Sequence, residues 1–397
     1  MTAIVTDAHY RMSVSLIRDL FDRGVRVAAC EKASIEAPVG FASRGAAQCV
    51  RLPDEEYEAA LLALCREVLE IEGEKPVLLP VGAKTLAMVS RSRDAFSAVA
   101  GLCAATPSQL ALFNDKAAVS ALAKTLGVPV PESFERQPEE ADEPFFSRVP
   151  LPCAVKPHCG ESFGLTASQR YRICRTKNEL IAAFRHFQTL TNEDPIVQEY
   201  LPGTAFGCSV LAKDGAVYRS LCHRRVREYP VSGGPSSCCE SVSREDLLAF
   251  SEALVRKTGF TGPAMFEFKC AADGSPRLLE VNPRVWGTFP LTRAAKTDFA
   301  YSWFCLAANL PLPEEVPAQH VKMAYYPADF AAGLGYLKAG QPGRFFAAAA
   351  DFLSPCVKNG IADPKDPAPA REAEISQAQQ SRWGRLKTAP EYDRSRT

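Results

Sequence analysis

The chain has 397 residues, more than most single domains, so we expect two or three subdomains. Its 47% hydrophobic and 23% charged residues are typical of an ordinary globular protein. Lysine plus arginine and aspartate plus glutamate both number 46, and this balance argues against a nucleic-acid-binding protein, which usually carries a basic excess.

The sequence indicates no targeting signal and no membrane span. Residues 1–12 lead directly into a strand pattern, without the basic and apolar segments of a signal peptide. No apolar run is long enough to cross a bilayer. We therefore expect a cytoplasmic protein that does not act on membranes. Its 14 cysteines contain no CxxC pair, and we interpret most of them as buried structural thiols.

Alternating strands and helices in residues 1–106 predict an N-terminal α/β domain with a parallel sheet. The predicted elements are a strand at 3–6, a helix at 12–23, and strands at 25–30 and 77–80 separated by a helix at 54–71. The first strand-to-helix turn lacks the glycines that bring a dinucleotide close to a helix, so we interpret this domain as a scaffold.

Residues 107–310 change to a mixed pattern that predicts a two-lobed α+β domain. We place a small lobe at about 115–200, preceded by a helix at 107–113, and a large lobe of antiparallel strands at about 201–310. In the small lobe we expect helices at 115–126 and 177–189, strands at 153–156, 171–174 and 195–200, and a loop at 132–150. In the large lobe we expect strands at 206–213, 216–224, 264–270 and 277–281, and a helix at 244–258.

The C-terminal part of the chain divides into two predicted segments. Residues 311–360 are interpreted as a helical extension. Residues 361–397 are poor in apolar side chains and rich in proline, charge and glutamine, so we expect a flexible tail.

The segment PRLLEVNPR carries the sharpest chemical signal. Side chains repeat every two residues in a strand, so Glu280, Asn282 and Arg284 share one face. Glu267, in the neighbouring strand MFEFK, could join them. Such oxygen ligands suit Mg²⁺, and the arginine suits a phosphoryl group. From this segment alone, an exposed strand face with mutually paired charges is an equally good interpretation.

Two lysines add to this signal. Lys156 lies in the apolar strand AVKP, where a lysine is costly unless it meets an anion, and a glycine-bearing loop follows it. Lys116 lies near the start of a helix, where its charge opposes the helix dipole and is better placed beside a phosphate. Lysines, loop and metal ligands together fit one triphosphate.

In order, the motifs NDK, AVKP with its glycine loop, QEYLPG, MFEFK and EVNPRVWGT resemble the ATP-grasp superfamily, which includes carbamoyl-phosphate synthases and carboxylate-amine ligases. The resemblance covers most of the chain and implies a pre-ATP-grasp domain followed by the two-lobed ATP-grasp domain. It implies ATP and one or two Mg²⁺ ions, or Mn²⁺, as cofactors, and small-molecule carboxylate and amine substrates. Similar enzymes are often homodimers.

The resemblance also implies individual roles. Glu267, Glu280 and Asn282 would hold the metal, Lys116 and Lys156 the phosphates, and Arg284 the transition state. The loop over the phosphates would include His158, Gly160, Ser162 and Gly164. The hinge that holds adenine would consist of Gln198, Glu199, Tyr200 and Leu201. Many relatives have an acidic ribose ligand shortly after the hinge, where this chain has Thr204, Ala205 and Phe206.

The segment CHRRVREYPVSGGPSS is interpreted as the acceptor side. Arginine clusters bind carboxylates and phosphates, although alone this segment would suit a solvated hairpin edge better. By resemblance Arg227 reaches the reacting group and is assigned a catalytic role. The candidate substrate residues are Arg225, Gly233, Gly234, Ser236 and Trp286, and for Trp286 aromatic core packing is the more common situation.

The leading hypothesis is an ATP-dependent ligase that converts a carboxylate into an acyl phosphate and then into an amide. A bicarbonate-activating enzyme related to biotin carboxylases is the second hypothesis. Against it, the sequence contains no second set of grasp motifs and no biotin-accepting MKM segment. The third is a nucleotide sensor without turnover, against which the complete metal and arginine set argues.

Overall fold

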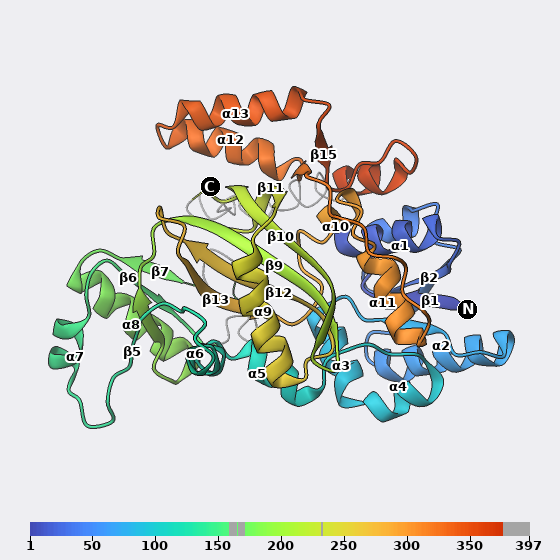
Figure 1. Ribbon diagram of the computed structural model, residues 1–397, viewed down its shortest axis with the longest axis horizontal. Helices are drawn as coiled ribbons and strands as arrows, with labels where there is room; N and C mark the ends of the chain where they lie inside the picture. The colour runs from blue at the N-terminus through green and yellow to red at the C-terminus, as the bar shows by residue number, and fades with distance from the viewer. Residues whose placement is uncertain (159–164, 166–170, 232, 376–397) are drawn as a thin grey trace, which may run out of the picture.

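The structure is a computed structural model that describes residues 1–158, 165, 171–231 and 233–375. Within these residues the strands form three sheets, one for each predicted α/β unit (Figure 1). His158 is therefore described, whereas Gly160, Ser162 and Gly164 of the predicted phosphate loop lie outside the described residues.

The N-terminal domain contains the predicted parallel sheet, with strand order β3-β2-β1-β4. Its strands are β1 (Thr2–Val5), β2 (Arg26–Lys32), β3 (Gln48–Leu52) and β4 (Val77–Leu79). Its helices are α1 (Arg11–Asp22), η1 (Val39–Ala42), α2 (Tyr57–Glu72), α3 (Ala83–Arg91) and α4 (Arg93–Val99). The β1-α1-β2 unit is confirmed. Strand β3 escapes sequence analysis because this edge strand is mostly exposed and lacks an apolar pattern.

The small lobe is built on an antiparallel sheet with order β5-β8-β6-β7. Its strands are β5 (Ser133–Phe134), β6 (Cys153–Lys156), β7 (Arg172–Cys174) and β8 (Ile196–Glu199), and its helices are α6 (Lys116–Thr125), α7 (Asp142–Arg148) and α8 (Lys177–Thr191). The predicted loop at 132–150 instead contains β5 and α7. Helix α7 is stabilised because Phe145 and Phe146 pack against Phe184 of α8.

The large lobe is a seven-stranded sheet with order β13-β12-β9-β10-β11-β14-β15. Its strands are β9 (Thr204–Lys213), β10 (Ala216–Glu228), β11 (Ser236–Val242), β12 (Gly262–Cys270), β13 (Pro276–Asn282), β14 (Lys322–Ala324) and β15 (Val357–Asn359). Helices α5 (Pro107–Asn114) and α9 (Glu245–Thr258) pack with apolar residues of this sheet such as Phe266 and Phe268. The predicted antiparallel lobe is confirmed except that β14 and β15 pair in parallel, and its opposite face packs partly against the core shared with the N-terminal domain and partly lines a cavity.

The segment after the lobes differs from the predicted helical extension. It contributes strands β14 and β15 to the large sheet, besides a helical hairpin of α12 (Ala328–Lys338) and α13 (Pro342–Leu353). The predicted tail is folded at its start, because Asp366 is buried against the N-terminal domain and accepts hydrogen bonds from Arg18 Nε (2.9 Å) and Ser43 Oγ (2.7 Å). Residues 376–397 of the predicted tail lie outside the described residues. A buried, fully paired carboxylate cannot be recognised from composition alone.

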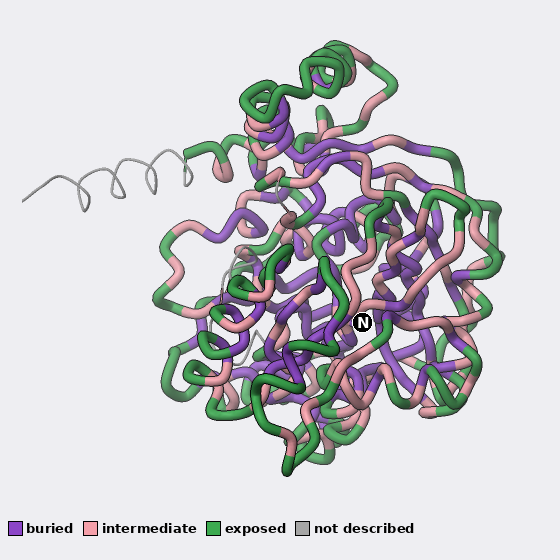
Figure 2. The backbone as a smooth tube through the Cα atoms, turned by 90° about the vertical axis from the view of Figure 1, so that its left-hand side faces the viewer, coloured by how far each residue is buried: buried purple, intermediate pink, exposed green. Residues whose placement is uncertain are grey.

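One apolar core joins the N-terminal domain to the large lobe. Helices α10 (Pro290–Ala294) and α11 (Phe299–Ala308) supply much of it, and Trp286 and Phe289 pack edge to face beside them. Figure 2 shows this buried interior and the mostly exposed α12–α13 hairpin at the top. Among the described residues, no helix has the length and apolar character needed to cross a membrane.

Candidate active site

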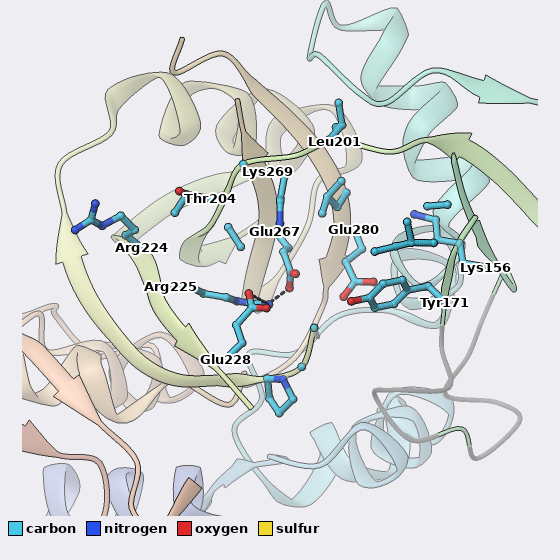
Figure 3. Close-up of a pocket in the computed structure, with 18 of the residues that line it drawn as sticks. Lys156, Tyr171, Leu201, Thr204, Arg224, Arg225, Glu228, Glu267, Lys269 and Glu280 are labelled. Atoms are coloured by element: carbon cyan, nitrogen blue, oxygen red, sulfur yellow. Dashed lines mark hydrogen bonds and ion pairs between the residues drawn. The ribbon is translucent and has the colours of Figure 1, made fainter. Parts of the chain in front are cut away.

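A cavity of about 820 Å³ lies between the small lobe and the open face of the large sheet (Figure 3). Its lining brings together the predicted metal and phosphate residues from segments far apart in the sequence. These residues are Lys116, Lys156, Glu267, Glu280, Asn282 and Arg284. The sequence therefore identified residues that share one cavity.

Strand pairing explains why the two carboxylates meet. Glu267 of β12 and Glu280 of β13 are direct partners in an antiparallel ladder, so their side chains extend from the same face. Asn282 lies two residues further along β13 on that face. On the next strand, β9, Glu267 pairs with Gly207, where the His223 ring packs against the backbone, whereas the small Ala205 lines the cavity.

Both carboxylates are paired with cations that come from other elements. Lys116 Nζ lies 2.9 Å from Glu280 Oε2, and Arg225 of β10 donates to Glu267 Oε2 at 2.5 Å. Arg225 also lies 3.6 Å from Glu228. Figure 3 shows Arg225 and Glu228 on one side of Glu267, with Glu280, Tyr171 and Lys156 on the other. Anion and cation pairs thus alternate along the cavity floor.

Burial and neighbouring charges give these groups different protonation behaviour. Burial raises the pKa of Glu267, against the opposing charge of Arg225. For Glu280 burial acts in the same direction, but Lys116, Lys156 and Arg225 outweigh it and lower the pKa to about 2. Burial, followed by the charge of Lys116, lowers the pKa of Lys156 to about 7. Glu280 is therefore a fixed anion, whereas Lys156 titrates near neutrality.

The cavity and its two lobes agree with what comparisons with known proteins reveal. The sequence family described as ATP-grasp in the biosynthetic pathway with Ter operon matches residues 191–326. This match covers less than half of the chain and agrees with the resemblance to the ATP-grasp superfamily that the sequence motifs indicate. A comparison with curated protein sequences found no match.

Solved structures with the ATP-grasp fold resemble the chain over most of its length. Biotin carboxylase from Campylobacter jejuni in a β,γ-ATP complex is 15% identical, with a TM-score of 0.64 over 81% of this chain and 74% of that one. The biotin carboxylase domain of Hydrogenobacter thermophilus 2-oxoglutarate carboxylase is 15% identical, with a TM-score of 0.62 over 81% and 73%. An L-amino acid ligase from Bacillus licheniformis is 16% identical, with a TM-score of 0.57 over 81% and 78%.

The predicted ATP-grasp hinge lines the cavity at the end of β8. Gln198 is buried and donates to Ser133 Oγ at 3.0 Å, while Glu199 Oε1 accepts from the backbone nitrogen of Glu132 at 3.2 Å. Tyr200 and Leu201 complete the wall. These contacts fix the hinge to the strand β5 beside it.

The segment after the hinge has no acidic side chain at the positions where many relatives have a ribose ligand. Thr204 and Ala205 line the cavity there, together with Lys269 (Figure 3). Lys269 was missed, although it shares a strand face with Glu267 because it follows two residues later in MFEFK. A cation therefore lies where many relatives place an acidic ribose ligand.

Arg227 is among the residues that line the cavity, but its guanidinium pairs with acidic residues of the α12–α13 hairpin. The Arg227 side chain is 3% exposed, and its guanidinium donates two hydrogen bonds to Asp329 of α12, at 2.9 and 2.8 Å, and a third to Asp351 of α13 at 2.7 Å. Register shifts at Arg225/Arg227 and Arg227/Glu228 disrupt the regular alternation of β10. Arg227 therefore ties the hairpin to β10 and its catalytic role stays a prediction, whereas Arg225 contacts the predicted metal ligand Glu267.

The predicted substrate residues divide into two groups. Gly233 and Gly234 line the cavity, and a side chain at Gly233 would meet the Tyr171 hydroxyl. Ser236 is outside it, because its hydroxyl is buried and donates to the Cys238 carbonyl at 3.0 Å. Trp286 is 2% exposed and is mainly a core residue, with one edge at the cavity.

Further lining residues could not be found from the sequence. Tyr171 follows the phosphate loop, and burial raises the pKa of its hydroxyl. Tyr336 and Arg344 belong to the α12–α13 hairpin, which no ATP-grasp motif marked. His158 lies at the end of β6 as predicted but is not among the lining residues.

Proposed function

We propose that this protein is an ATP-dependent carboxylate-amine ligase. The observation that carries the proposal is the facing pair Glu267 and Glu280, surrounded by Lys116, Lys156 and Arg225 in one interlobe cavity. A pair of half-buried carboxylates needs compensating charge, which here comes from lysines and an arginine. A metal ion could take over this compensation and leave the lysines free to bind phosphates.

The residues present fit Mg²⁺ that arrives with a nucleotide. Glu267, Glu280 and Asn282 would hold it through oxygen atoms, which this hard cation prefers. Across the described residues there is no cluster of three or more His, Cys, Asp or Glu able to hold a metal. Two carboxylates and an amide leave further positions for phosphate oxygens and water, as one or two Mg²⁺ ions would require. Bound there, the metal would neutralise charge on the β- and γ-phosphates.

The other cavity residues have roles that follow from their positions. Lys116 and Lys156 would bind the phosphates, and the hinge Gln198 to Leu201 would hold adenine. Arg284 would stabilise charge that develops on the transferring phosphoryl group. Arg225 takes the place assigned to Arg227, because a metal bound to Glu267 would release its guanidinium for the reacting carboxylate.

The proposed reaction has two displacements. A carboxylate oxygen attacks the γ-phosphorus, the bond from that phosphorus to the bridging oxygen breaks, and ADP leaves with the electron pair. The amine nitrogen of the second substrate then attacks the acyl carbon, phosphate leaves, and the extra proton on nitrogen passes to solvent. The cavity would have to exclude water during the reaction, because water otherwise hydrolyses the acyl phosphate.

Bicarbonate is the alternative first acceptor, because two of the similar structures are biotin carboxylases. An L-amino acid ligase is also among the similar structures, and the lack of a biotin-accepting MKM segment in the sequence favours the amide-forming reaction. Bicarbonate-dependent ADP release without any amine requirement would identify the alternative.

Mg·ATP should stabilise the protein against heat, and phosphate release should depend on substrate. At a ligand concentration about 100 times Kd, binding to the folded state adds about 2.7 kcal/mol to the free energy of unfolding. Differential scanning fluorimetry with ATP, with and without excess EDTA, measures this. Phosphate release across pairs of amino acids then tests turnover. Nucleotide binding without turnover on any pair, or with bicarbonate, would leave the sensor hypothesis as the correct one.

Nucleotide affinity should fall as the pH rises above neutrality. Lys156 has a pKa of about 7 in the free protein, and a bound phosphate favours its protonated form, so binding above that pH takes up a proton. Kd for Mg·ADP should rise by up to about tenfold per pH unit between about pH 7 and pH 9. Titration calorimetry measures it. Lys156→Arg, which stays charged, should flatten the dependence. A wild-type Kd for Mg·ADP that does not change with pH would contradict the assignment of Lys156 to phosphate binding.

A further inference from the structure

The α12–α13 hairpin forms a wall of the cavity. Tyr336 of α12 and Arg344 of α13 line the cavity beside Val231 and Gly233, which belong to the turn that follows β10. The hairpin lies beyond β10 and β11 (Figure 1), whereas the hinge belongs to the small lobe. Its position therefore suits the second substrate better than the nucleotide.

A buried charge network holds the hairpin in place. Arg227 contacts Asp329 and Asp351, as described above, and Ser237 Oγ donates to Asp329 at 2.9 Å. Lys322 of β14 donates to Asp351 at 2.7 Å. Both helices are thus attached to the sheet by charges that balance, two acids against two bases.

The turn after β10 is confined between the hairpin and the small lobe. A Cβ atom on Gly335 would lie 2.9 Å from Val231 Cγ1, so the backbone of α12 packs directly against this turn. On the other side, Gly233 closely approaches Tyr171 of the small lobe. The hairpin is therefore part of the cavity's shape rather than a separate appendage.

Arg344 is a solvent-exposed cation that lines this wall of the cavity. Its guanidinium lies 5.0 Å from the centre of the Tyr336 ring, and Tyr336 is 4% exposed, so the aromatic platform is fixed. Among the described residues, no carboxylate lies within ion-pairing distance of Arg344. The nearby acids Asp329, Asp351 and Glu228 all pair with other cations.

We propose that Arg344, stacked on Tyr336, binds a carboxylate of the second, amine-bearing substrate, which would make that substrate an amino acid. This inference rests on the proposed ligase function. A planar guanidinium can bind a carboxylate through two hydrogen bonds. Arg344 belongs to the α12–α13 hairpin, whereas the predicted phosphate residues Lys116 and Lys156 belong to the small lobe. Arg344 would determine specificity and take no part in phosphoryl transfer.

Binding measurements test this without requiring turnover. The protein saturated with Mg·ADP is titrated with each common amino acid and with its carboxamide, and thermal stabilisation gives the affinities. The wild-type protein should bind at least one amino acid about 10- to 100-fold more tightly than its carboxamide, the value of one charge-assisted contact. Arg344→Met should remove that preference, and Arg344→Lys should restore part of it.

Lys338→Met is the matched control, because Lys338 is an exposed cation of the same hairpin that does not line the cavity. It should retain the wild-type preference. Equal binding of acids and carboxamides by the wild-type protein, or an unchanged preference in Arg344→Met, would overturn the assignment. Absence of phosphate release by the wild-type protein in the separate amino-acid screen would instead refute the ligase function. Failure of the Arg344 assignment and failure of the ligase function are therefore distinguishable.

Discussion

Replacing Glu280 with glutamine should lower kcat/KM by about 100- to 1,000-fold, the size of effect seen when a preorganised charge is removed from an active site. Glu280 has a pKa of about 2 and is therefore ionised at any pH at which the protein is assayed. Glutamine keeps the shape of the side chain but supplies no charge to a divalent cation. Steady-state phosphate release with a productive substrate pair measures the loss.

The Glu280→Gln variant should also distinguish metal binding from nucleotide binding. Glu280 also neutralises Lys116, so the glutamine variant leaves that lysine with one fewer anion and should bind metal-free ATP at least as well as the wild type. The extra thermal stabilisation that Mg²⁺ adds to ATP should disappear. A variant with magnesium-dependent turnover within about threefold of wild type would show that Glu280 is not a metal ligand.

Glu240→Gln is the control for this substitution. Glu240 is also a strand glutamate paired with an arginine, since Arg224 Nε donates to it at 2.8 Å, but it does not line the cavity. Surface pairs of this kind contribute about 0 to 1 kcal/mol. Its kinetics should match those of the wild type.

The sequence could predict those parts of the site that follow from strand periodicity. Glu280 and Asn282 share a face because side chains alternate along β13, and Glu267 joins them through simple antiparallel pairing. Apolar patterns likewise predicted the parallel N-terminal sheet and the antiparallel large lobe. Each of these features follows from the pattern of residues within a short stretch of sequence.

Features that depend on distant contacts could not be predicted. Arg225 and Arg227 are two residues apart in β10, yet irregular pairing with β11 sends them to different partners. Nothing in the local sequence shows that Asp329, about a hundred positions away, will bury one of them. For the same reason Arg344 joins the cavity without any motif around it.

Replacing Arg227 with methionine should destabilise the protein by about 3–5 kcal/mol, because Asp329 would remain buried without its partner. The free energy of unfolding from urea denaturation measures this effect. Arg224→Met, which disrupts only the pair with Glu240 near the surface, should cost less than about 1 kcal/mol. The difference between the Arg227 and Arg224 variants tests whether burial, rather than charge alone, determines how much each arginine contributes to stability.

A double variant distinguishes a structural Arg227 from a catalytic one. Combining Arg227→Met with Asp329→Leu removes both buried charges and should recover much of the lost stability, because an apolar pair of similar volume can replace a buried ion pair. Mg·ATP binding should be normal, since the phosphate residues Lys116 and Lys156 are untouched, while KM for the amine substrate rises if the hairpin shifts. If Arg227 instead bound the reacting carboxylate, the single variant would remain stable and lose turnover, and the double variant would not regain it.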